Sequence, residues 1–310
     1  MSTPSPIKHF LRDDDLTAAE QAEVLDLAAA LKAAPYDSKP LAGPQTVAII
    51  FDKPTLRTQA SFVAGIAELG GHPMVVDGNL AQIGTRESIA DVARVLGRQA
   101  SLIVWRTHDQ SRIEEMAAYA GVPVVNALTD QFHPCQTLAD LLTIREHKGS
   151  TAGLTMTFLG DAACNMGHSY LLSGALAGMH VRVSGPDGFQ PDPAILARAQ
   201  EIAAGTGGSA QIVDDPKQAA EGADVLITDT WISMGKEAES ADRAEVFRPW
   251  QLNADLLALG NDAIVMHCLP AYRGKEITAD VLDGPSSVIW DEAENRRHAQ
   301  KAIMQWLVTR

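Results

Sequence analysis

Short apolar runs alternate with helix-forming stretches along almost the whole chain, and this alternation constrains the fold more than any other feature. In the first half, strands are predicted at residues 46–51, 74–77, 102–106 and 122–126, each followed by a helix. After a break at residues 148–150, strands are predicted at residues 154–159, 180–183, 210–213, 224–228 and 263–266. Strands separated by helices favour parallel sheets with helices on both faces. We therefore predict an α/β protein of two doubly wound parallel-sheet domains with a cleft between them.

The length of the chain agrees with two domains, because 310 residues exceed one ordinary core. We predict a first domain over residues 1–148 and a second over residues 149–292, followed by a C-terminal helix within residues 293–310. The stretch 236–248 is polar and acidic without a clear period. It is predicted to be a loop over the cleft.

Composition excludes several classes of protein. Hydrophobic residues make up 46% of the chain and charged residues 21%, which is typical of a globular protein. The net charge of -14 argues against a nucleic-acid partner. Three cysteines give no disulfide framework and suit a reducing cytosol, and no apolar stretch is long enough to span a bilayer. We expect a cytoplasmic protein with neither nucleic acid nor membrane as partner.

A candidate anion site lies where the first predicted strand meets its helix, at Thr55-Leu56-Arg57-Thr58. Unpaired N–H groups and the positive end of the helix dipole attract anions there, and Arg can bind two phosphate oxygens at once. Arg106 ends the third predicted strand, at the same edge of the sheet. An ordinary Thr-capped helix with a surface arginine is the alternative.

Other polar residues follow further predicted strands. His133 and Gln136 are three apart, so they lie on one helix face, where both could donate to a carbonyl oxygen. The alternative is helix capping by His133 with a helix-starting Pro134. In the second half, Asp229 follows a strand and could hold an ammonium group, or it could simply start a turn.

Histidine and cysteine recur close together, which leaves two further readings open. A zinc site is one, although the spacings do not match a closed structural site. A hydrolase with Cys268 as the attacking thiolate is the other, and spacing alone does not rule it out. A nicotinamide cofactor is rejected, because Gly160 is alone where a dinucleotide loop needs two more glycines.

Taken together, these segments resemble the aspartate/ornithine carbamoyltransferase family, and within it the ornithine-specific branch. The resemblance covers nearly the whole chain through segments 51–62, 82–84, 105–107, 133–136, 161–166, 229–235, 267–270 and 294–296. It implies transfer of the carbamoyl group of carbamoyl phosphate to the δ-amine of L-ornithine, giving L-citrulline and phosphate, in arginine metabolism. It also implies that residues 293–310 return to the first domain, that the protein is a homotrimer, and that it needs no cofactor or metal.

The resemblance also assigns roles to residues. For carbamoyl phosphate binding it implies Thr55, Leu56, Arg57, Thr58, Gln82, Arg106, His133, Pro134, Cys135, Gln136, Cys268, Leu269 and Arg296. For ornithine binding it implies Asn165, Asp229, Ser233 and Met234. The catalytic residues would be Arg106, His133, Gln136, Asp229, Cys268 and Arg296.

This chain departs from the family pattern in its phosphate loop and at Cys164. The usual phosphate loop reads Ser-Thr-Arg-Thr-Arg, whereas this chain has Leu56 at the second position and Gln59 at the fifth. Leu56 loses a hydroxyl and Gln59 loses a positive charge, which affects the affinity for carbamoyl phosphate rather than its identity. Cys164 stands before Asn165 where a second Asn is common.

Overall fold

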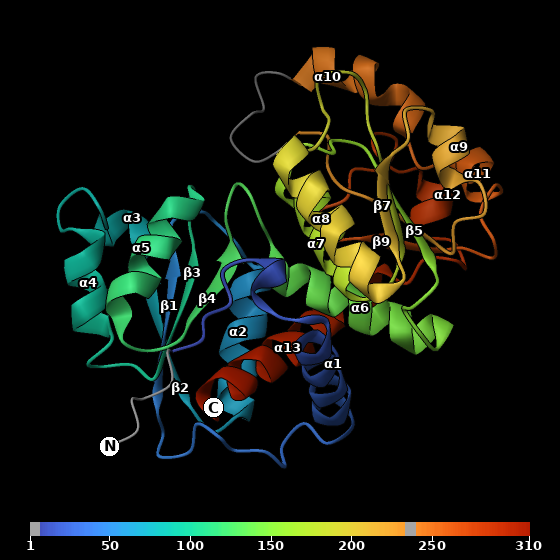
Figure 1. Cartoon of the computed structure of the whole chain (residues 1–310). Helices are drawn as coiled ribbons and strands as arrows, with labels where there is room; N and C mark the ends of the chain where they lie inside the picture. Colours follow the sequence, from blue (N-terminus) through green and yellow to red (C-terminus); the bar gives the residue numbers. More distant parts are fainter. Residues whose placement is uncertain (1–6, 233–239) are drawn as a thin grey trace. The chain divides into compact units, whose positions relative to one another are not determined.

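The structure, a computed structural model, describes residues 7–232 and 240–310. The chain divides into two compact units: residues up to Leu138 together with Arg296–Arg310, and Ala139–Asn295. Each unit contains its own parallel sheet with flanking helices, which confirms the predicted fold class (Figure 1). Among the described residues, no helix combines the length and apolar character needed to cross a membrane.

The sheet of the first unit has the strand order β2-β1-β3-β4, and all neighbouring strands are parallel. Its strands are β1 (Thr46–Phe51), β2 (His72–Asp77), β3 (Leu102–Arg106) and β4 (Val124–Leu128). The interior strand β1 is an almost continuous apolar run, as expected for a parallel strand covered on both faces. Phe51 pairs with Arg106, so the carboxyl ends of β1 and β3 meet at one edge.

Helices cover both faces of this first sheet. Helices α4 (Ile89–Leu96) and α5 (Gln110–Ala120) pack their apolar residues against β1 and β3 on one face. Helix α2 (Arg57–Glu68) lies on the opposite face (Figure 1). The unit also contains α1 (Ala18–Ala33), the short α3 (Gly78–Ala81) and the start of α6 (Pro134–Lys148).

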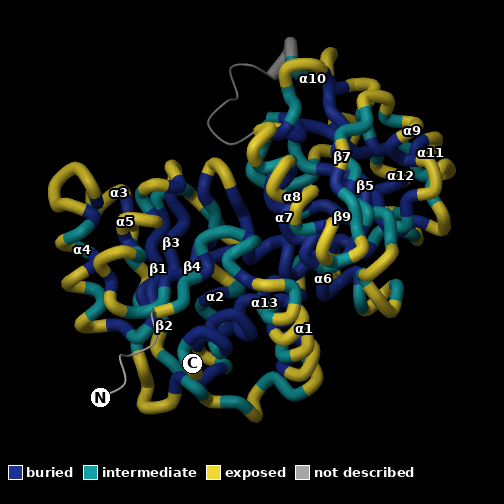
Figure 2. Tube along the Cα trace, viewed as in Figure 1, coloured by how far each residue is buried: buried dark blue, intermediate teal, exposed yellow. Residues whose placement is uncertain are grey.

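The sheet of the second unit has the strand order β7-β6-β5-β8-β9, again all parallel. Its strands are β5 (Thr155–Leu159), β6 (His180–Ser184), β7 (Ser209–Ile212), β8 (Val225–Thr228) and β9 (Ile264–His267). One face packs against α9 (Pro216–Ala220), α11 (Ala254–Leu257) and α12 (Ala279–Leu282). Helices α7 (Asn165–Leu176) and α8 (Pro193–Thr206) lie on the other face (Figure 1). The strands are largely buried, as the dark segments of Figure 2 show.

The prediction of a loop over residues 236–248 is wrong for residues 240–248; residues 236–239 lie outside the described part of the chain. Helix α10 (Ser240–Phe247) is followed by a 3₁₀ turn at Arg248–Trp250. Phe247 is fully buried, and its ring centroid lies 4.7 Å from that of Phe189 and 5.8 Å from that of Trp231. A single deeply buried aromatic anchors this helix, so the sequence shows little apolar periodicity.

The C-terminal helix α13 (Ile289–Val308) returns to the first unit from Arg296 onward, as the resemblance implies. Lys301 is fully buried there, and its Nζ donates to Glu68 Oε2 and to the Pro35 carbonyl oxygen, both at 2.7 Å. Gly65 of α2 leaves the space, because a Cβ at this position would lie 3.0 Å from Lys301 Cγ. A buried lysine needs such a carboxylate partner. This ion pair therefore fixes α13 against α2.

Candidate functional site

In the first unit, four of the predicted site residues are joined by hydrogen bonds. Thr58 Oγ1 accepts from Arg296 Nη2 at 2.7 Å and from Arg106 Nη1 at 3.5 Å. Arg296 Nη1 also donates to Gln136 Oε1. All four residues are at most 5% exposed. They come from α2, β3, α6 and α13, so the fold gathers residues that are up to 238 positions apart in the sequence.

The electrostatics around His133 indicate a site for an anion. Burial lowers the pKa of His133 well below its usual value, and the positive charges of Arg296, Arg106 and Arg57 lower it further. The imidazole is therefore neutral at neutral pH. It can donate one N–H to a substrate oxygen, while the guanidinium groups supply the positive charge.

The residues of the predicted phosphate loop lie around this buried group. Leu56 is the N-cap of α2 and its side chain makes no capping hydrogen bond, so the Thr-capped alternative is wrong. Leu56 is 81% exposed, and Arg57 and Gln59 are exposed as well. Thr55 is half-buried. The first N–H groups of a helix have no partner within the helix, so a helix start with exposed Leu56 and Arg57 is suited to binding an anion.

The two residues that follow His133, Pro134 and Cys135, have side chains with structural roles. Pro134 begins α6, where its missing N–H costs nothing. Cys135 is buried, and its Sγ donates to the Asn126 carbonyl oxygen at 3.3 Å. Burial raises the pKa of the Cys135 thiol to about 12. Its side chain is thus a protonated packing group, and only the backbone of this residue is suited to ligand binding.

In the second unit, the ends of β8 and β9 bring Asp229 and Cys268 together. Asp229 Oδ1 accepts from the Thr230 N–H at 2.7 Å, and the Cys268 thiol donates to the same carboxylate. Burial raises the pKa of Asp229, and burial followed by the charges of Asp229 and Glu292 raises the pKa of Cys268 well above its usual value. A thiol that stays protonated is a poor nucleophile, which argues against the cysteine hydrolase alternative.

Asn165 and Cys164 lie at the next strand end, where β5 leads into α7. Asn165 is the first residue of α7, and Cys164 is its N-cap. Burial raises the pKa of Cys164, as do the carboxylates of Asp161 and Asp229, so the ends of β5 and β8 are electrostatically coupled. Asn165 and Asp229 thus share one edge of the sheet. The other two predicted ornithine residues, Ser233 and Met234, lie outside the described residues.

The backbone turn at Cys268-Leu269 is shaped by His267, which belongs to the resemblance segment 267–270 but was given no substrate-binding role. Leu269 has a φ of 62°, and its N–H donates to His267 Nδ1 at 2.9 Å. Because Nδ1 accepts, Nε2 carries the proton and faces Glu276 Oε1 at 3.3 Å. His267 and Glu276 are nine residues apart, so no local sequence pattern indicated that they form a buried pair.

Asp229, His267 and Cys268 are also the group of described residues to consider for a metal, since their ligand atoms lie within 4.8 Å of one another. Both ring nitrogens of His267 already face protein partners, the Leu269 N–H and the Glu276 carboxylate. A metal ion would have to displace one of them. The geometry therefore favours a hydrogen-bonded network over a metal centre.

Arg243 of α10 is a residue that sequence reasoning missed. Its Nη1 donates to Asp161 Oδ2 at 3.2 Å and to the Trp231 carbonyl oxygen at 2.8 Å. Its guanidinium lies 4.8 Å from the centroid of the Phe189 ring. Arg243 thus links the loop after β5, which leads to Asn165, with the loop after β8, which carries Asp229.

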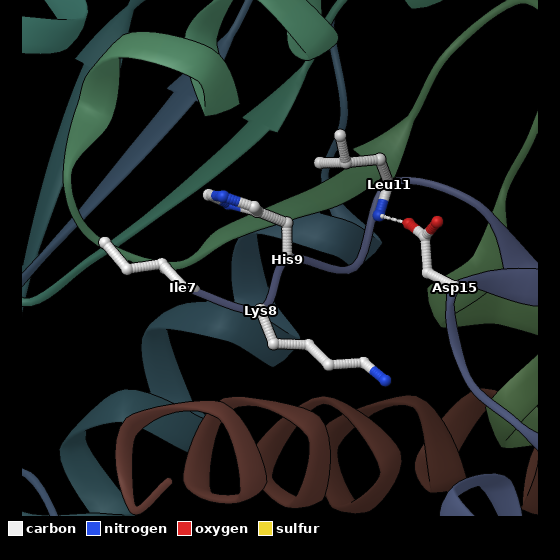
Figure 3. A pocket seen from close by; sticks show the side chains of 5 residues that line it. All are labelled: Ile7, Lys8, His9, Leu11 and Asp15. Carbon is white, nitrogen blue, oxygen red and sulfur yellow. Dashed lines mark hydrogen bonds between the residues drawn. The ribbon is translucent and has the colours of Figure 1, made fainter. Parts of the chain in front are cut away.

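A separate open pocket is lined by Ile7, Lys8, His9, Leu11 and Asp15 (Figure 3). Its polar groups hold the N-terminal segment: Asp15 Oδ2 accepts from the Leu11 N–H at 2.6 Å, and His9 Nδ1 accepts from the Val124 N–H at 3.1 Å. None of the predicted site residues lines it. We interpret it as a structural hollow of the N-terminal segment.

Family models match both halves of the chain. Residues 8–146 match the model described as the carbamoyl-P binding domain of aspartate/ornithine carbamoyltransferase. Residues 152–307 match the model described as the Asp/Orn binding domain of the same family. The first match includes His133, Arg57 and Arg106, and the second includes Asp229, Cys268 and Arg296.

Individual relatives resemble the chain over almost its full length. Ornithine carbamoyltransferase of Clavibacter michiganensis subsp. michiganensis is 58% identical over 302 residues, which cover 97% of this chain and 98% of the relative. The structure of ornithine carbamoyltransferase from Pyrococcus furiosus is 42% identical with a TM-score of 0.92, and the match covers 98% and 97% of the two chains. An acetylornithine transcarbamylase complexed with acetylcitrulline is 32% identical with a TM-score of 0.88, covering 97% and 99%.

Proposed function

Because this chain belongs to the aspartate/ornithine carbamoyltransferase family and is a carbamoyltransferase, we propose that its acceptor substrate is L-ornithine. The products are then L-citrulline and phosphate, and the reaction belongs to arginine metabolism. One observation carries the proposal: the two predicted half-sites have opposite electrostatic character. The group around His133 is cationic, and the group around Asp229 and Cys268 is anionic.

The cationic and anionic character of the two groups matches the charges of the two substrates. Carbamoyl phosphate is an anion, which suits the guanidinium groups of Arg57, Arg106 and Arg296. Ornithine carries an α-ammonium group, which suits the partly buried carboxylate of Asp229. Aspartate as acceptor would bring a second carboxylate to this anionic group. The charge pattern therefore favours ornithine over aspartate.

The proposed reaction is a direct transfer. The lone pair of the δ-nitrogen attacks the carbamoyl carbon, the bond from that carbon to the phosphate oxygen breaks, and phosphate leaves with the bonding electrons. The surplus proton of the amine passes to the departing phosphate. Such a reaction requires orientation of both substrates and donors for the developing charge rather than a covalent intermediate.

We assign the residues as follows. The phosphate is held by Thr55, Leu56, Arg57, Thr58, Gln82 and Arg106, with Leu56 contributing its backbone N–H. The carbonyl oxygen of the carbamoyl group accepts from His133, Gln136 and Arg296, and the backbone around Pro134 and Cys135 shapes this region. The NH₂ group donates to the carbonyl oxygens of Cys268 and Leu269. The amino-acid end of ornithine binds Asn165, Asp229, Ser233 and Met234.

The choice of acceptor is tested by offering ornithine, N-acetylornithine, putrescine and aspartate singly with carbamoyl phosphate. We expect kcat/KM to be highest for ornithine. A preference for N-acetylornithine would place the chain with the acetylornithine transcarbamylases, and a preference for aspartate or putrescine would reject the role given to Asp229. Each product is identified by mass spectrometry, so that the comparison does not depend on one colour reaction.

The pH dependence tests the role of Cys268. Activity is expected to rise with pH until the ornithine amine is largely neutral, because its reference pKa is about 10.4 and only the neutral amine can attack. Since the pKa of Cys268 is raised by burial and by Asp229, the thiol remains a proton donor over this range. Cys268→Ala should raise the KM for ornithine about tenfold, as expected for loss of one hydrogen bond to a charged group.

The same variant distinguishes direct transfer from covalent catalysis. If Cys268→Ala keeps the wild-type kcat and KM at every pH, the thiol has no part in the reaction. A carbamoyl-cysteine adduct trapped on the wild-type protein would contradict direct transfer. Cys135→Ala is the matched control, because that thiol is also protonated but donates only to the Asn126 carbonyl.

We further propose that the protein is a homotrimer in which Gln82 binds the phosphate held by a neighbouring subunit. Gln82 is exposed and its amide can donate to a phosphate oxygen. Arg57→Ala and Gln82→Ala should each be poorly active alone. When the two are refolded together, some sites combine an intact Arg57 with an intact Gln82 from the next chain.

The fraction of activity that the mixture regains can be calculated. In a closed ring with head-to-tail interfaces, random mixing makes about a quarter of the sites wild type in composition. We therefore expect the mixture to recover about that fraction of wild-type activity. No recovery in oligomers shown by mass spectrometry to be mixed would mean that Gln82 acts in its own chain or not at all.

A further inference from the structure

We propose that Arg112 is a positioning residue for carbamoyl phosphate, because it fixes the loop that carries Gln82. The inference rests on the proposed function, since it takes the Gln82 amide as a hydrogen-bond donor to the phosphate. Arg112 lies on α5, outside every motif that the sequence singled out. It reaches three segments that are separated in the sequence, and each of its contacts is in the first unit.

The first contact is with the loop itself. Arg112 Nη2 donates to the Ile83 carbonyl oxygen at 2.8 Å, directly after Gln82. The loop is also tightly packed on this side chain, since a Cβ at Gly84 would lie 2.9 Å from Arg112 Nη1. Gly84 has a φ of 81°, which favours glycine independently of packing.

The other contacts tie Arg112 to the carboxyl edge of the sheet. Its Nε donates to Thr107 Oγ1 at 3.0 Å, and its Nη2 lies 3.4 Å from Asp52 Oδ2. Thr107 Oγ1 in turn donates to Asp52 Oδ2 at 2.6 Å. Thr107 follows Arg106 directly, and Asp52 follows β1. The guanidinium therefore connects the Gln82 loop to the strand ends that carry the phosphate-binding residues.

Two further features hold the guanidinium in place. It lies 5.2 Å from the centroid of the buried Trp105 ring, which restricts the plane of the side chain. Asp52 is held from the other side by α3, because a Cβ at Gly78 would lie 1.9 Å from Asp52 Oδ1. The arginine is thus fixed by an aromatic face and a carboxylate.

The backbone of Gln82 shows why this support matters. Gln82 has a φ of 50°, in the left-handed region that a side-chain-bearing residue adopts at a cost. Its carbonyl oxygen accepts from the N–H groups of Thr85 and Arg86, at 3.0 and 2.9 Å. The loop therefore closes locally, and Arg112 ties it to the sheet of its own subunit. Without that tie, the Gln82 amide is no longer held in one position from which to reach the phosphate of the neighbouring subunit.

The test is a double-mutant cycle of Arg112→Met with Gln82→Ala. Met keeps the apolar stem over Trp105 but removes every donor. Arg112→Met alone should raise the KM for carbamoyl phosphate about tenfold, comparable to loss of one hydrogen bond to a charged group, with the KM for ornithine unchanged. In the Gln82→Ala background the same substitution should add little, because the group that it positions is already gone.

Arg94→Met is the matched control. Arg94 also pairs with an aspartate, Asp91, at 2.9 Å and lies 4.6 Å from the ring centroid of Tyr119, and neither of these partners belongs to the Gln82 loop. Arg94→Met should leave the KM for carbamoyl phosphate and the KM for ornithine unchanged. Arg112→Lys retains a charged donor and should fall between wild type and Arg112→Met, and it replaces Arg112→Met should that variant fail to fold.

Additive effects of Arg112→Met and Gln82→Ala, a rise in the ornithine KM, or an unchanged KM for carbamoyl phosphate would each overturn the proposal. The cycle is repeated by calorimetry with inorganic phosphate as ligand, which needs no turnover. Failure of the wild type to make citrulline would reject the proposed function. The phosphate-binding cycle would still show whether Arg112 acts through Gln82.

Discussion

Arg296→Met is expected to lower kcat/KM for carbamoyl phosphate about 10²- to 10³-fold, the loss typical of removing one preorganised donor for developing charge. Arg296 is buried, and it contacts both Thr58 and Gln136. The substitution removes the positive charge that we propose for the carbamoyl oxygen, together with the hydrogen bonds to Thr58 and Gln136. The effect should appear in the saturation curve for carbamoyl phosphate, measured at fixed saturating ornithine.

The neighbouring Arg297 provides the control. It lies on the same helix and pairs with Glu68 at 3.3 Å, which is a structural contact. Arg297→Met should lower thermal stability slightly and leave kcat/KM near the wild-type value, since the Arg297 side chain is partly exposed and Glu68 keeps its bond to Lys301. Equal losses of activity in the two variants would mean that Arg296 acts only by holding α13.

Asp229→Asn is expected to raise the KM for ornithine about 10²-fold, because it removes the negative partner of a largely desolvated ammonium group. The amide keeps the size of the side chain and can still accept from the Thr230 N–H. Carbamoyl phosphate binding should be unchanged. Because burial raises the pKa of Asp229, the wild-type KM for ornithine should also start to rise at a higher pH, on acidification, than it would for a surface aspartate.

Asp224 is the matched control, since it lies at the opposite end of the same strand β8. Its Oδ2 accepts from the Thr155 N–H at 2.8 Å and its Oδ1 accepts from Asn261 at 2.9 Å. Asp224→Asn should leave the KM for ornithine unchanged. If Asp229→Asn also handles ornithine normally, Asp229 is a residue of the turn after β8 and not a ligand.

The fold could be predicted because strand–helix alternation is a local pattern. The apolar runs at Val47–Ile50 and Val225–Thr228 indicated buried parallel strands, and the structure has both. Helix α10 was missed because its position depends on Phe247 packing against Phe189 and Trp231, which the sequence does not bring together. Prediction from a sequence pattern depends on apolar periodicity, and α10 lacks that periodicity because it packs mainly through Phe247.

The strand–helix pattern by itself predicted only those residues of the candidate site that lie at the ends of strands. Residues at strand ends, such as Arg106 and Asp229, are indicated by their place in the alternation. The supporting contacts are not: the pairing of His267 with Glu276 arises from tertiary packing, and Arg112 contacts a loop 29 positions away. Their roles depend on backbone geometry at Leu269 and Gln82, both at positive φ. Neither residue type predicts that geometry.

The most direct measurement follows the carbamoyl carbon from substrate to product. Carbamoyl phosphate labelled with ¹³C is incubated with ornithine and the wild-type protein, and the label is located by NMR while phosphate release is measured in parallel. Direct transfer predicts the label in the ureido carbon on the δ-nitrogen of citrulline, with one phosphate released for each citrulline formed. Phosphate released without labelled citrulline, or label held on the protein, would contradict the proposed reaction.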